Sequence, residues 1–368
     1  MSDPRRVLVV GAGIAGLATA RALLGQGIQT DVVERSDSWR HPGAGVYLPA
    51  NAVRALGALG LGSSFLDRAC PITQQRFLDH RGRVLVEVDL HAVWGATGPC
   101  AAIEHRSLHE LLREGIPVRR GTTVTALEEE GPRVHVVFDD GSSSDYDLVV
   151  GADGVRSWVR TVVFGGAPPR PLAQASWRFL ADDIGQTSAW TVHLGRTTAF
   201  LMIPLGRGRI YCYADVTSPA AVDPTAGDPV TLGELYRDFA EPVPTIVDEL
   251  LAAGNSPHFS AIQEVTQEPW VTGRVVLVGD AAHAMSPNMA QGVGMALEDA
   301  LVLAQTVAAG RPLHDYEARR RSRVRFVQTQ THRRDRTRGL PTVVRDAALR
   351  IGGQRIFRSN YHALLGEP

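Results

Sequence analysis

The amino-terminal part of the sequence contains a glycine pattern that could hold a phosphate group. Gly11, Gly13 and Gly16 form G-x-G-x-x-G directly after the apolar residues 7–10. Such glycines let the backbone turn tightly and approach a pyrophosphate, which then lies at the amino terminus of the following helix. Small residues after the first glycines, Ala15 among them, keep that helix slim enough to pack on a sheet.

A carboxylate follows this pattern at a distance typical of a ribose contact. Glu34 ends a second apolar run and lies about 20 residues after Gly13, the spacing found in dinucleotide-binding folds. A carboxylate there accepts hydrogen bonds from ribose hydroxyls and would repel a 2'-phosphate. Together, the strand, glycine turn, helix, strand and terminal acid predict a dinucleotide site, and both NAD and FAD fit it.

A second stretch, residues 275–300, combines an apolar run with an acid and a glycine-rich turn. The run stops at Gly279 and Asp280, and Pro287 and Gly292 then lead into a new helical pattern. A dehydrogenase that uses only NAD would explain the amino terminus but would leave this stretch without a role.

The rest of the chain predicts the elements that must position these residues. Residues 71–98 contain a β-hairpin pattern, and residues 175–215 are rich in alternating strands. We therefore expect an α/β fold in which a Rossmann-like nucleotide-binding domain is interleaved with a smaller, largely antiparallel β-sheet domain and followed by helices. The expected boundaries are 1–70, 99–171 and 265–310 for the nucleotide domain, 71–98 and 172–264 for the sheet domain, and 311–368 for the C-terminal helical segment.

The composition excludes several classes of protein. Of 368 residues 44% are hydrophobic and 21% charged, with a formal net charge of -1, as in ordinary soluble proteins. There is no lysine, which excludes Schiff-base chemistry and a P-loop lysine. Three cysteines without paired spacing suggest neither a disulfide framework nor a metal site. No apolar run is long enough for a membrane span, so a cytoplasmic protein, monomer or homodimer, is expected.

The segment 316–339 is strongly basic, but it lacks the interleaved aromatic residues that stack on nucleic-acid bases. We therefore expect no nucleic-acid partner. An exposed helix face whose arginine stems cover apolar surface is the expected structure of this segment.

With these motifs in order, the sequence resembles the group A flavoprotein monooxygenases, the family of p-hydroxybenzoate hydroxylase, salicylate hydroxylase, FAD-dependent urate hydroxylase and the tetracycline-modifying monooxygenases. The resemblance spans about residues 5–325 and includes the motif "DGVRSWVR" around Asp153 and Gly154. It implies non-covalent FAD, NADH or NADPH as co-substrate, and O2. The implied reaction is hydroxylation of a small aromatic or heteroaromatic substrate through a C4a-hydroperoxide of the flavin.

The resemblance also assigns residues to the cofactor. Glu34 and Arg35 would lie at the adenosine ribose, Arg106 would reach FAD from a helix start, and Val124 would make a backbone contact near adenine. Asp280 would accept a hydrogen bond from the ribityl chain, and the helix that opens near Gly292 would direct its positive end at the flavin ring. The expected set is Gly11, Gly13, Ala15, Gly16, Glu34, Arg35, Val46, Arg106, Val124, Asp153, Gly154, Asp280, Pro287, Gly292 and Val293.

Two residues depart from the family pattern. Many relatives have glycine and asparagine where this chain has Ala290 and Gly294. Backbone contacts to FAD survive both changes, whereas a side-chain contact from that asparagine cannot. For Arg106 the alternative to a cofactor contact is an ion pair on the helix surface.

The substrate pocket is predicted from strand alternation. In "RIYCYADV", Tyr211 and Tyr213 share one face of a strand, and His193 lies on a neighbouring predicted strand. A Tyr or His beside a phenol hydroxyl would help to draw off its proton, since phenolate is the more electron-rich ring. The alternative for each is an ordinary packed residue. Alternatives for the whole protein are oxygenation or epoxidation of a larger natural product, and a non-catalytic FAD-binding relative.

Overall fold

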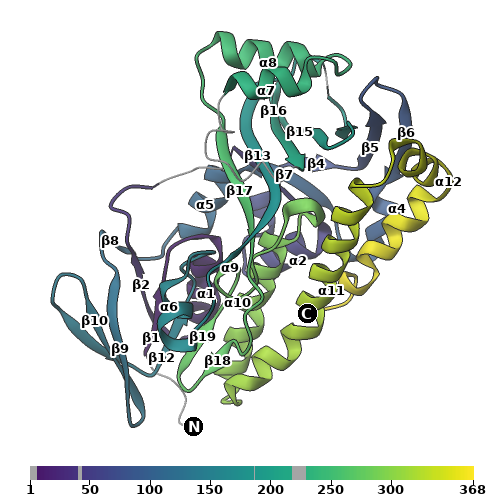
Figure 1. Cartoon of the computed structure of the whole chain (residues 1–368). Coiled ribbons are helices and arrows are strands. Elements are labelled where there is room, and N and C mark those ends of the chain that lie inside the picture. The colour runs from purple at the N-terminus through teal and green to yellow at the C-terminus, as the bar shows by residue number, and fades with distance from the viewer. Residues whose placement is uncertain (1–5, 40–43, 186, 218–228) are drawn as a thin grey trace.

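A mainly parallel six-stranded sheet brings the two glycine-containing motifs to the same edge (Figure 1). The computed structural model describes residues 6–39, 44–185, 187–217 and 229–368. The carboxyl ends of parallel strands meet at one edge of a sheet, and this is where ligands of such folds bind. The strands, in spatial order, are β18 (Val271–Thr272), β19 (Val275–Leu277), β12 (Leu148–Gly151), β1 (Arg6–Val10), β2 (Gln29–Glu34) and β8 (Arg119–Arg120).

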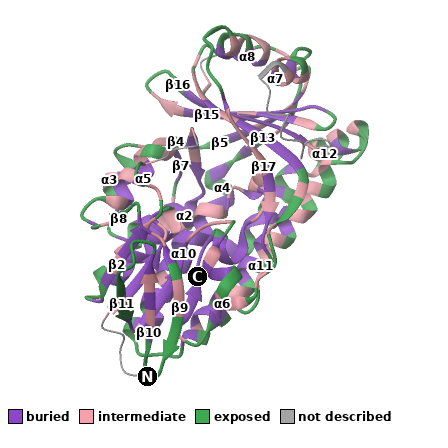
Figure 2. Cartoon of the chain, turned by 60° about the vertical axis from the view of Figure 1, so that its left-hand side comes forward, coloured by how far each residue is buried: buried purple, intermediate pink, exposed green. Residues whose placement is uncertain are grey.

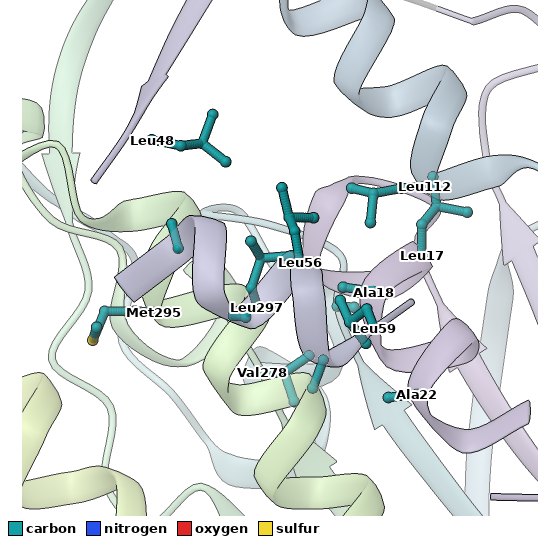
Figure 3. Packing of buried hydrophobic residues seen from close by; sticks show 14 of the residues in the cluster. Leu17, Ala18, Ala22, Leu48, Leu56, Leu59, Leu112, Val278, Met295 and Leu297 are labelled. Carbon is teal, nitrogen blue, oxygen red and sulfur yellow. The ribbon is translucent and has the colours of Figure 1, made fainter. Parts of the chain in front are cut away.

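Three helices pack together beside this sheet. They are α1 (Ile14–Gly25), α2 (Ala50–Ala58) and α10 (Gly292–Ala308). Figure 3 shows Leu17, Ala18, Leu56 and Leu297 in the apolar packing between them, and all four are fully buried. The small side chains of α1 also let α10 come close, so the helix that follows the second motif is fixed against the helix of the first.

A seven-stranded sheet forms the second large layer, and its strands come from two distant parts of the chain. The hairpin predicted within residues 71–98 is confirmed as β5 and β6, and β5 pairs in parallel with β14. All other neighbours in this sheet are antiparallel. The order is β17 (His258–Glu264), β13 (Arg170–Asp182), β16 (Arg209–Thr217), β15 (Thr198–Gly206), β14 (Trp190–Leu194), β5 (Gln74–Asp79) and β6 (Val84–Asp89).

One face of this sheet is covered by α7 (Pro229–Tyr236) and α8 (Val243–Ala252), which lie at the top of Figure 1. A separate apolar core fills the space between them and includes Trp177, Phe200 and Ile246. The other face is therefore free to line a binding site. The domain boundaries given above remain a prediction.

Two three-stranded sheets and several short helices complete the layers. One sheet, β11-β10-β9, extends from the end of the molecule that carries the amino terminus, and the other, β3-β7-β4, lies between the two large sheets. Their bounds are β9 (Val124–Glu130), β10 (Arg133–Phe138), β11 (Ser143–Tyr146), β3 (Gly45–Leu48), β4 (Cys70–Ile72) and β7 (Cys100–Glu104). The helices are α3 (Gly62–Leu66), α4 (Leu90–Trp94), α5 (His105–Arg113), α6 (Trp158–Phe164) and α9 (Asp280–His283).

The C-terminal helices α11 (Leu313–Arg338) and α12 (Thr342–Tyr361) run along the side of both layers (Figure 1). Figure 2 shows that α12 keeps exposed residues on its outer side. In the described part of the chain no helix is long and apolar enough to cross a membrane. The expectation of an exposed basic face is wrong for part of α11, because Arg320 and Arg323 are buried.

These two arginines belong to a buried charge cluster that we define as Glu298, Asp299, Arg320, Arg323 and His283. The guanidinium of Arg320 donates to Asp299 at 2.8 Å and to Glu298 at 2.7 Å, and Arg323 also donates to Glu298 at 2.7 Å. Asp299 accepts from the ring of His283 at 2.6 Å. The acids on α10 thus satisfy the arginines of α11, which explains why a strongly basic helix can be buried.

We predict that Asp299→Asn lowers the free energy of unfolding by about 3 kcal/mol, because it leaves the buried Arg320 with only one charged partner. Urea unfolding followed by circular dichroism measures this change. The matched control is Glu87→Gln, which breaks the exposed pair between Arg76 and Glu87 and should change stability by no more than about 0.5 kcal/mol. Equal effects of the two variants would contradict a structural role for the cluster.

Candidate functional site

A cavity of about 1720 Å³ lies between the carboxyl edge of the six-stranded sheet, the open face of the seven-stranded sheet, and helices α11 and α12. Pockets for one small molecule typically measure about 300–1,000 Å³. This cavity therefore has room for a dinucleotide together with a substrate. Within the described residues no group of three His, Cys, Asp or Glu side chains could hold a metal ion.

The glycine motif forms a cradle at one end of the cavity. A Cβ atom on Gly11, whose φ is +104°, would lie 2.6 Å from the carbonyl oxygen of Ala152, and a Cβ on Gly16 would overlap the carbonyl oxygen of Gly11. Both positions lie beneath the cavity wall and require glycine. Gly13 and Ala15 line the cavity, and a Cβ on Gly13 would meet no atom within 4 Å. The start of α1 is therefore open to a pyrophosphate.

Glu34 and Arg35 line the cavity next to this cradle. The carboxylate of Glu34 accepts hydrogen bonds from the backbone N–H of Ala12 at 3.0 Å and from that of Ser36 at 2.9 Å. These bonds fix the carboxylate against the glycine loop. Because each carboxylate oxygen has a further lone pair, Glu34 can still accept hydrogen bonds from ribose hydroxyls.

Asp153 and Gly154 also line the cavity, but the carboxylate of Asp153 has a local task. It accepts from the backbone N–H of Trp158 at 2.7 Å and of Val159 at 3.1 Å, and from the hydroxyl of Ser157. Burial raises its pKa, and these hydrogen bonds act in the opposite direction. Asp153 therefore fixes the start of α6, which leaves the backbone at Gly154 facing the cavity.

Asp280 faces the cavity from the end of β19. Its carboxylate forms no hydrogen bond or ion pair with the described residues. The surrounding protein raises its pKa by desolvation, whereas His283 and Arg178 lower it. A carboxylate held without a partner beside a cavity fits a row of ribityl hydroxyls.

The helix α10 begins at Gly292, as the sequence predicts, and Pro287, Gly292 and Val293 all line the cavity. A Cβ atom on Gly292 would meet no atom within 4 Å. The amino terminus of this 17-residue helix is thus open to a negatively polarised group, such as the N1 and C2 carbonyl edge of a flavin. The residues present fit an extended FAD at both ends.

The structure explains one of the two departures from the family pattern, that at Gly294, and gives no reason for the alanine at position 290. Ala290 has a φ of +50°, a conformation that favours the glycine of relatives. At Gly294 a Cβ atom would lie 2.9 Å from the amide oxygen of Gln291 and 3.1 Å from the amide nitrogen of Asn51. Asn51 and Gln291 form a buried reciprocal pair at 3.0 and 3.2 Å. Gly294 makes room for this pair, so a larger residue there would displace it.

Besides Gly11 and Gly16, three predicted site residues do not line the cavity. Val124 is buried in β9, and Arg106 is exposed, where it forms an ion pair with Glu110 at 2.8 Å. This ion pair on the helix surface is the alternative to a cofactor contact that the sequence suggests for Arg106. The residues of α5 that do line the cavity are His105 and His109, which lie one turn apart. His193, the third, lies on the opposite face of its strand from Val192 and Leu194, which line the cavity. The prediction that its strand neighbours that of the tyrosines is wrong, because β15 lies between β14 and β16.

The alternation predicted for β16 is confirmed. Tyr211, Tyr213 and Asp215 line the cavity, whereas Ile210, Cys212 and Ala214 belong to the core beneath α7 and α8. Tyr211 also packs against β3, because a Cβ atom on Gly45 of that strand would lie 2.6 Å from the tyrosine side chain. The cavity-facing side of β16 therefore lies close to the strand that carries Val46, which also lines the cavity.

Sequence reasoning did not single out Arg178. It lies opposite Tyr213 in the pairing of β13 with β16, and its guanidinium carbon is 5.6 Å from the centroid of the Tyr213 ring. It lines the cavity and has no hydrogen-bonded carboxylate among the described residues. Asp215, by contrast, is paired with Arg338 of α11. The signal in the sequence that could have identified Arg178 is a single arginine within the apolar run "SWRFLA".

Comparisons with known proteins agree with this geometry. A family model described as "FAD binding domain" matches residues 5–331. The chain is 34% identical over 354 residues to 3-amino-4-hydroxybenzoate 2-monooxygenase PtnB3 of Streptomyces platensis, with 91% of this chain and 87% of that protein covered. It is 34% identical, over an alignment of 389 positions, to the FAD-dependent urate hydroxylase of Klebsiella pneumoniae subsp. pneumoniae, with 99% of each covered.

Solved structures show the same fold. The crystal structure of Klebsiella pneumoniae HpxO complexed with FAD and uric acid matches with a TM-score of 0.90 and 28% identity, and 99% of this chain and 97% of that chain are covered. A salicylate hydroxylase substrate complex matches with a TM-score of 0.78 at 23% identity, with 100% and 99% covered. From the cradle, the cavity-lining carboxylate of Asp280 and these matches we conclude that the chain belongs to the FAD-binding domain family and is a class A FAD-dependent monooxygenase.

Proposed function

We propose that this protein hydroxylates an acidic aromatic or heteroaromatic ring, with NADH or NADPH as reductant and O2 as oxidant. One oxygen atom enters the ring in place of hydrogen, and the other leaves as water. The observation that carries this proposal is the position of Arg178, Tyr211 and Tyr213, which line the cavity on the same face of two paired strands.

The cofactor would be held by the cradle at Gly13, the carboxylates of Glu34 and Asp280, and the start of α10. When bound, FAD supplies the transfer of electrons from the nicotinamide and the activation of O2. The protein itself would contribute cavity walls from the two large sheets and the C-terminal helices that limit access of water, and side chains that hold the substrate ring in place.

Arg178 is suited to bind the anionic form of the substrate. An arginine without a carboxylate partner, partly shielded from solvent, attracts a phenolate or carboxylate strongly. Its charge also acts on Asp280, whose pKa it lowers, and on Tyr211 and Tyr213. The substrate anion would therefore bind between the sheet and the ribityl-facing end of the cofactor site.

The two tyrosines act as hydrogen-bond donors in this scheme. Burial raises the pKa of Tyr211 to about 12 and raises that of Tyr213 further above its usual value. Both hydroxyls are therefore neutral at physiological pH and can donate to a phenolate oxygen, which stabilises the electron-rich ring that hydroxylation needs. His193 has a pKa lowered by burial to about 4 and lies outside the cavity lining, so it has no part in this scheme.

A second candidate function is oxygenation of a larger natural product on the same scaffold. The observation that favours it is the apolar wall that α12 adds to the cavity, formed by Ala348, Leu349, Ile356 and Phe357. The two candidates differ in the size of the substrate and share the chemistry at the ring.

We predict that Asp280→Ala raises the dissociation constant for FAD about tenfold or more, since it removes a charged hydrogen-bond acceptor from the ribityl site. Titration of the apoprotein with FAD, followed by flavin fluorescence, measures the affinity. Asp67→Ala, the same change at an exposed helix end, serves as the control. An unchanged affinity of the Asp280 variant would contradict the proposed contact.

A further prediction concerns the tyrosines. Tyr211→Phe or Tyr213→Phe should reduce substrate-stimulated NAD(P)H oxidation about tenfold, because a lost hydrogen bond to an anion raises the barrier by about 1.4 kcal/mol. The variants are compared on a panel of phenols and N-heterocycles. Tyr146→Phe, whose hydroxyl bonds to Asp31 in the wild type, is the matched control. If both pocket variants oxidise NAD(P)H at the parental rate, the substrate binds at another wall of the cavity.

Replacing Arg178 tests the charge of the substrate. Arg178→Gln should raise the KM of a phenol that carries a carboxylate about tenfold or more, and that of the matching neutral phenol much less. The panel pairs 4-hydroxybenzoate with 4-hydroxybenzamide, and 3-hydroxybenzoate with 3-hydroxybenzamide. A uniform rise in KM for acids and amides would argue against an ionic contact.

A further inference from the structure

The cavity-facing side of the seven-stranded sheet changes from polar to apolar along the strand order. At β17, β13 and β16 the lining side chains are mainly polar: His258, Ser260, Arg178, Tyr211, Tyr213 and Asp215. At β15, β14, β5 and β6 they are mainly apolar: Leu201, Ile203, Val192, Leu194, Phe77 and Val86. The reactive ring is proposed to bind at the polar half, so the apolar half remains for another part of the substrate.

Helix α12 covers the apolar half. It packs so closely on β6 that a Cβ atom on Gly353 would lie 2.8 Å from the side chain of Val86. The rings of Phe357 on α12 and Phe77 on β5 have centroids 5.8 Å apart. The apolar half is therefore a channel between β-sheet and helix, which suits an apolar arm attached to the ring.

Within this apolar half lie two polar groups without protein partners. Gln75 of β5 and Trp190 of β14 are opposite each other in the parallel pairing of these strands, and both line the cavity. Gln75 is 1% exposed and Trp190 is 6% exposed. Among the described residues no hydrogen-bond partner is found for the amide nitrogen and oxygen of Gln75 or for the indole nitrogen of Trp190.

Such an arrangement is costly without a ligand. A buried amide that forms no hydrogen bond destabilises a fold, and most buried polar groups have partners. The two charged side chains of this half already have partners: Arg345 donates to the carbonyl of Gly195 at 2.6 Å, and Arg334 donates to the hydroxyl of Tyr361 at 3.1 Å. A neutral group is therefore the fitting partner for Gln75 and Trp190.

We propose that Gln75 and Trp190 bind a neutral carboxamide-type group on an apolar arm of the substrate. This inference rests on the proposed function and adds a substrate class to it: an aromatic ring that carries an apolar arm with an internal amide. Trp190 Nε1–H and Gln75 Nε2–H donate to the two lone pairs of the amide carbonyl oxygen. Both residues determine specificity and take no part in the chemistry.

The test compares two probes of similar length on the FAD-loaded enzyme. The first, 4-hydroxy-N-hexylbenzamide, has an amide in its arm, and the second, 4-octylphenol, has none. Dissociation constants are measured from the change in flavin absorbance on binding, without turnover. We expect Gln75→Met to weaken the amide probe about tenfold and to leave 4-octylphenol unchanged or tighter, because Met keeps the length and loses the hydrogen bonds.

Trp190→Phe should also weaken the amide probe selectively, about threefold or more. Its matched control is Trp177→Phe, which removes another unpartnered indole nitrogen from the core on the opposite face and should change neither affinity. Thermal unfolding of Gln75→Met is measured in parallel, and a midpoint no lower than that of the parent is expected, since Gln75 has no protein partner to lose.

Three results would overturn the inference: no binding of the amide probe, equal effects of Gln75→Met on both probes, or a loss of FAD affinity in that variant. Product analysis separates this inference from the proposed function. Selective binding without hydroxylation of either probe would support the amide site and contradict the hydroxylase, whereas hydroxylation without selectivity would do the reverse.

Discussion

The buried charge cluster around Asp299 fixes the cofactor end of the molecule to the C-terminal helices. Asp299 accepts from the backbone N–H of Gly279 at 2.9 Å as well as from His283 and Arg320. The hydroxyl of Tyr316 on α11 also donates to the carbonyl of Leu277 at 3.0 Å. The turn that presents Asp280 is therefore fixed by side chains from α10 and α11, and its direction depends on charges that are shielded from solvent.

The two faces of the seven-stranded sheet have different surroundings. One face packs against α7 and α8 and supplies stability, while the other face lines the cavity and supplies recognition. Since alternate residues of a strand point to opposite faces, each strand contributes to both. The polar half carries the side chains that we propose to bind the substrate ring, and the apolar half lies beneath α12.

Much of the cofactor site could be predicted from the sequence because its signals are local. The glycine pattern and the carboxylate of Glu34 lie within one strand-helix-strand unit, and the alternation in β16 needs only a period of two. Arg106 shows the limit of such reasoning: it does lie at a helix start, but a shift of one residue around the helix places His105 at the cavity and Arg106 in solvent. The sequence pattern alone does not determine how α5 is rotated about its axis, and therefore which of its residues face the cavity.

Other features depend on contacts between distant parts of the chain. Gln75 and Trp190 are 115 positions apart and meet only through a parallel strand pair, and nothing near Gln75 in the sequence marks it as buried. In the same way, the basic composition of α11 suggested an exposed surface, because the acids that neutralise Arg320 and Arg323 lie on another helix. Charge alone could not reveal burial without knowledge of the partner.

The position of β19 in the chain has a consequence for biosynthesis. This strand and α10 complete the layer that begins with β1 and α1, yet they follow the whole seven-stranded sheet in sequence. As the chain emerges from the ribosome, the glycine turn is made before the seven-stranded sheet, whereas Asp280, which we propose to face the ribityl chain, is made only after that sheet. Domains fold during synthesis in the order in which their parts appear, so the nascent chain must keep the unpaired edge of β12 from other partners until β19 arrives.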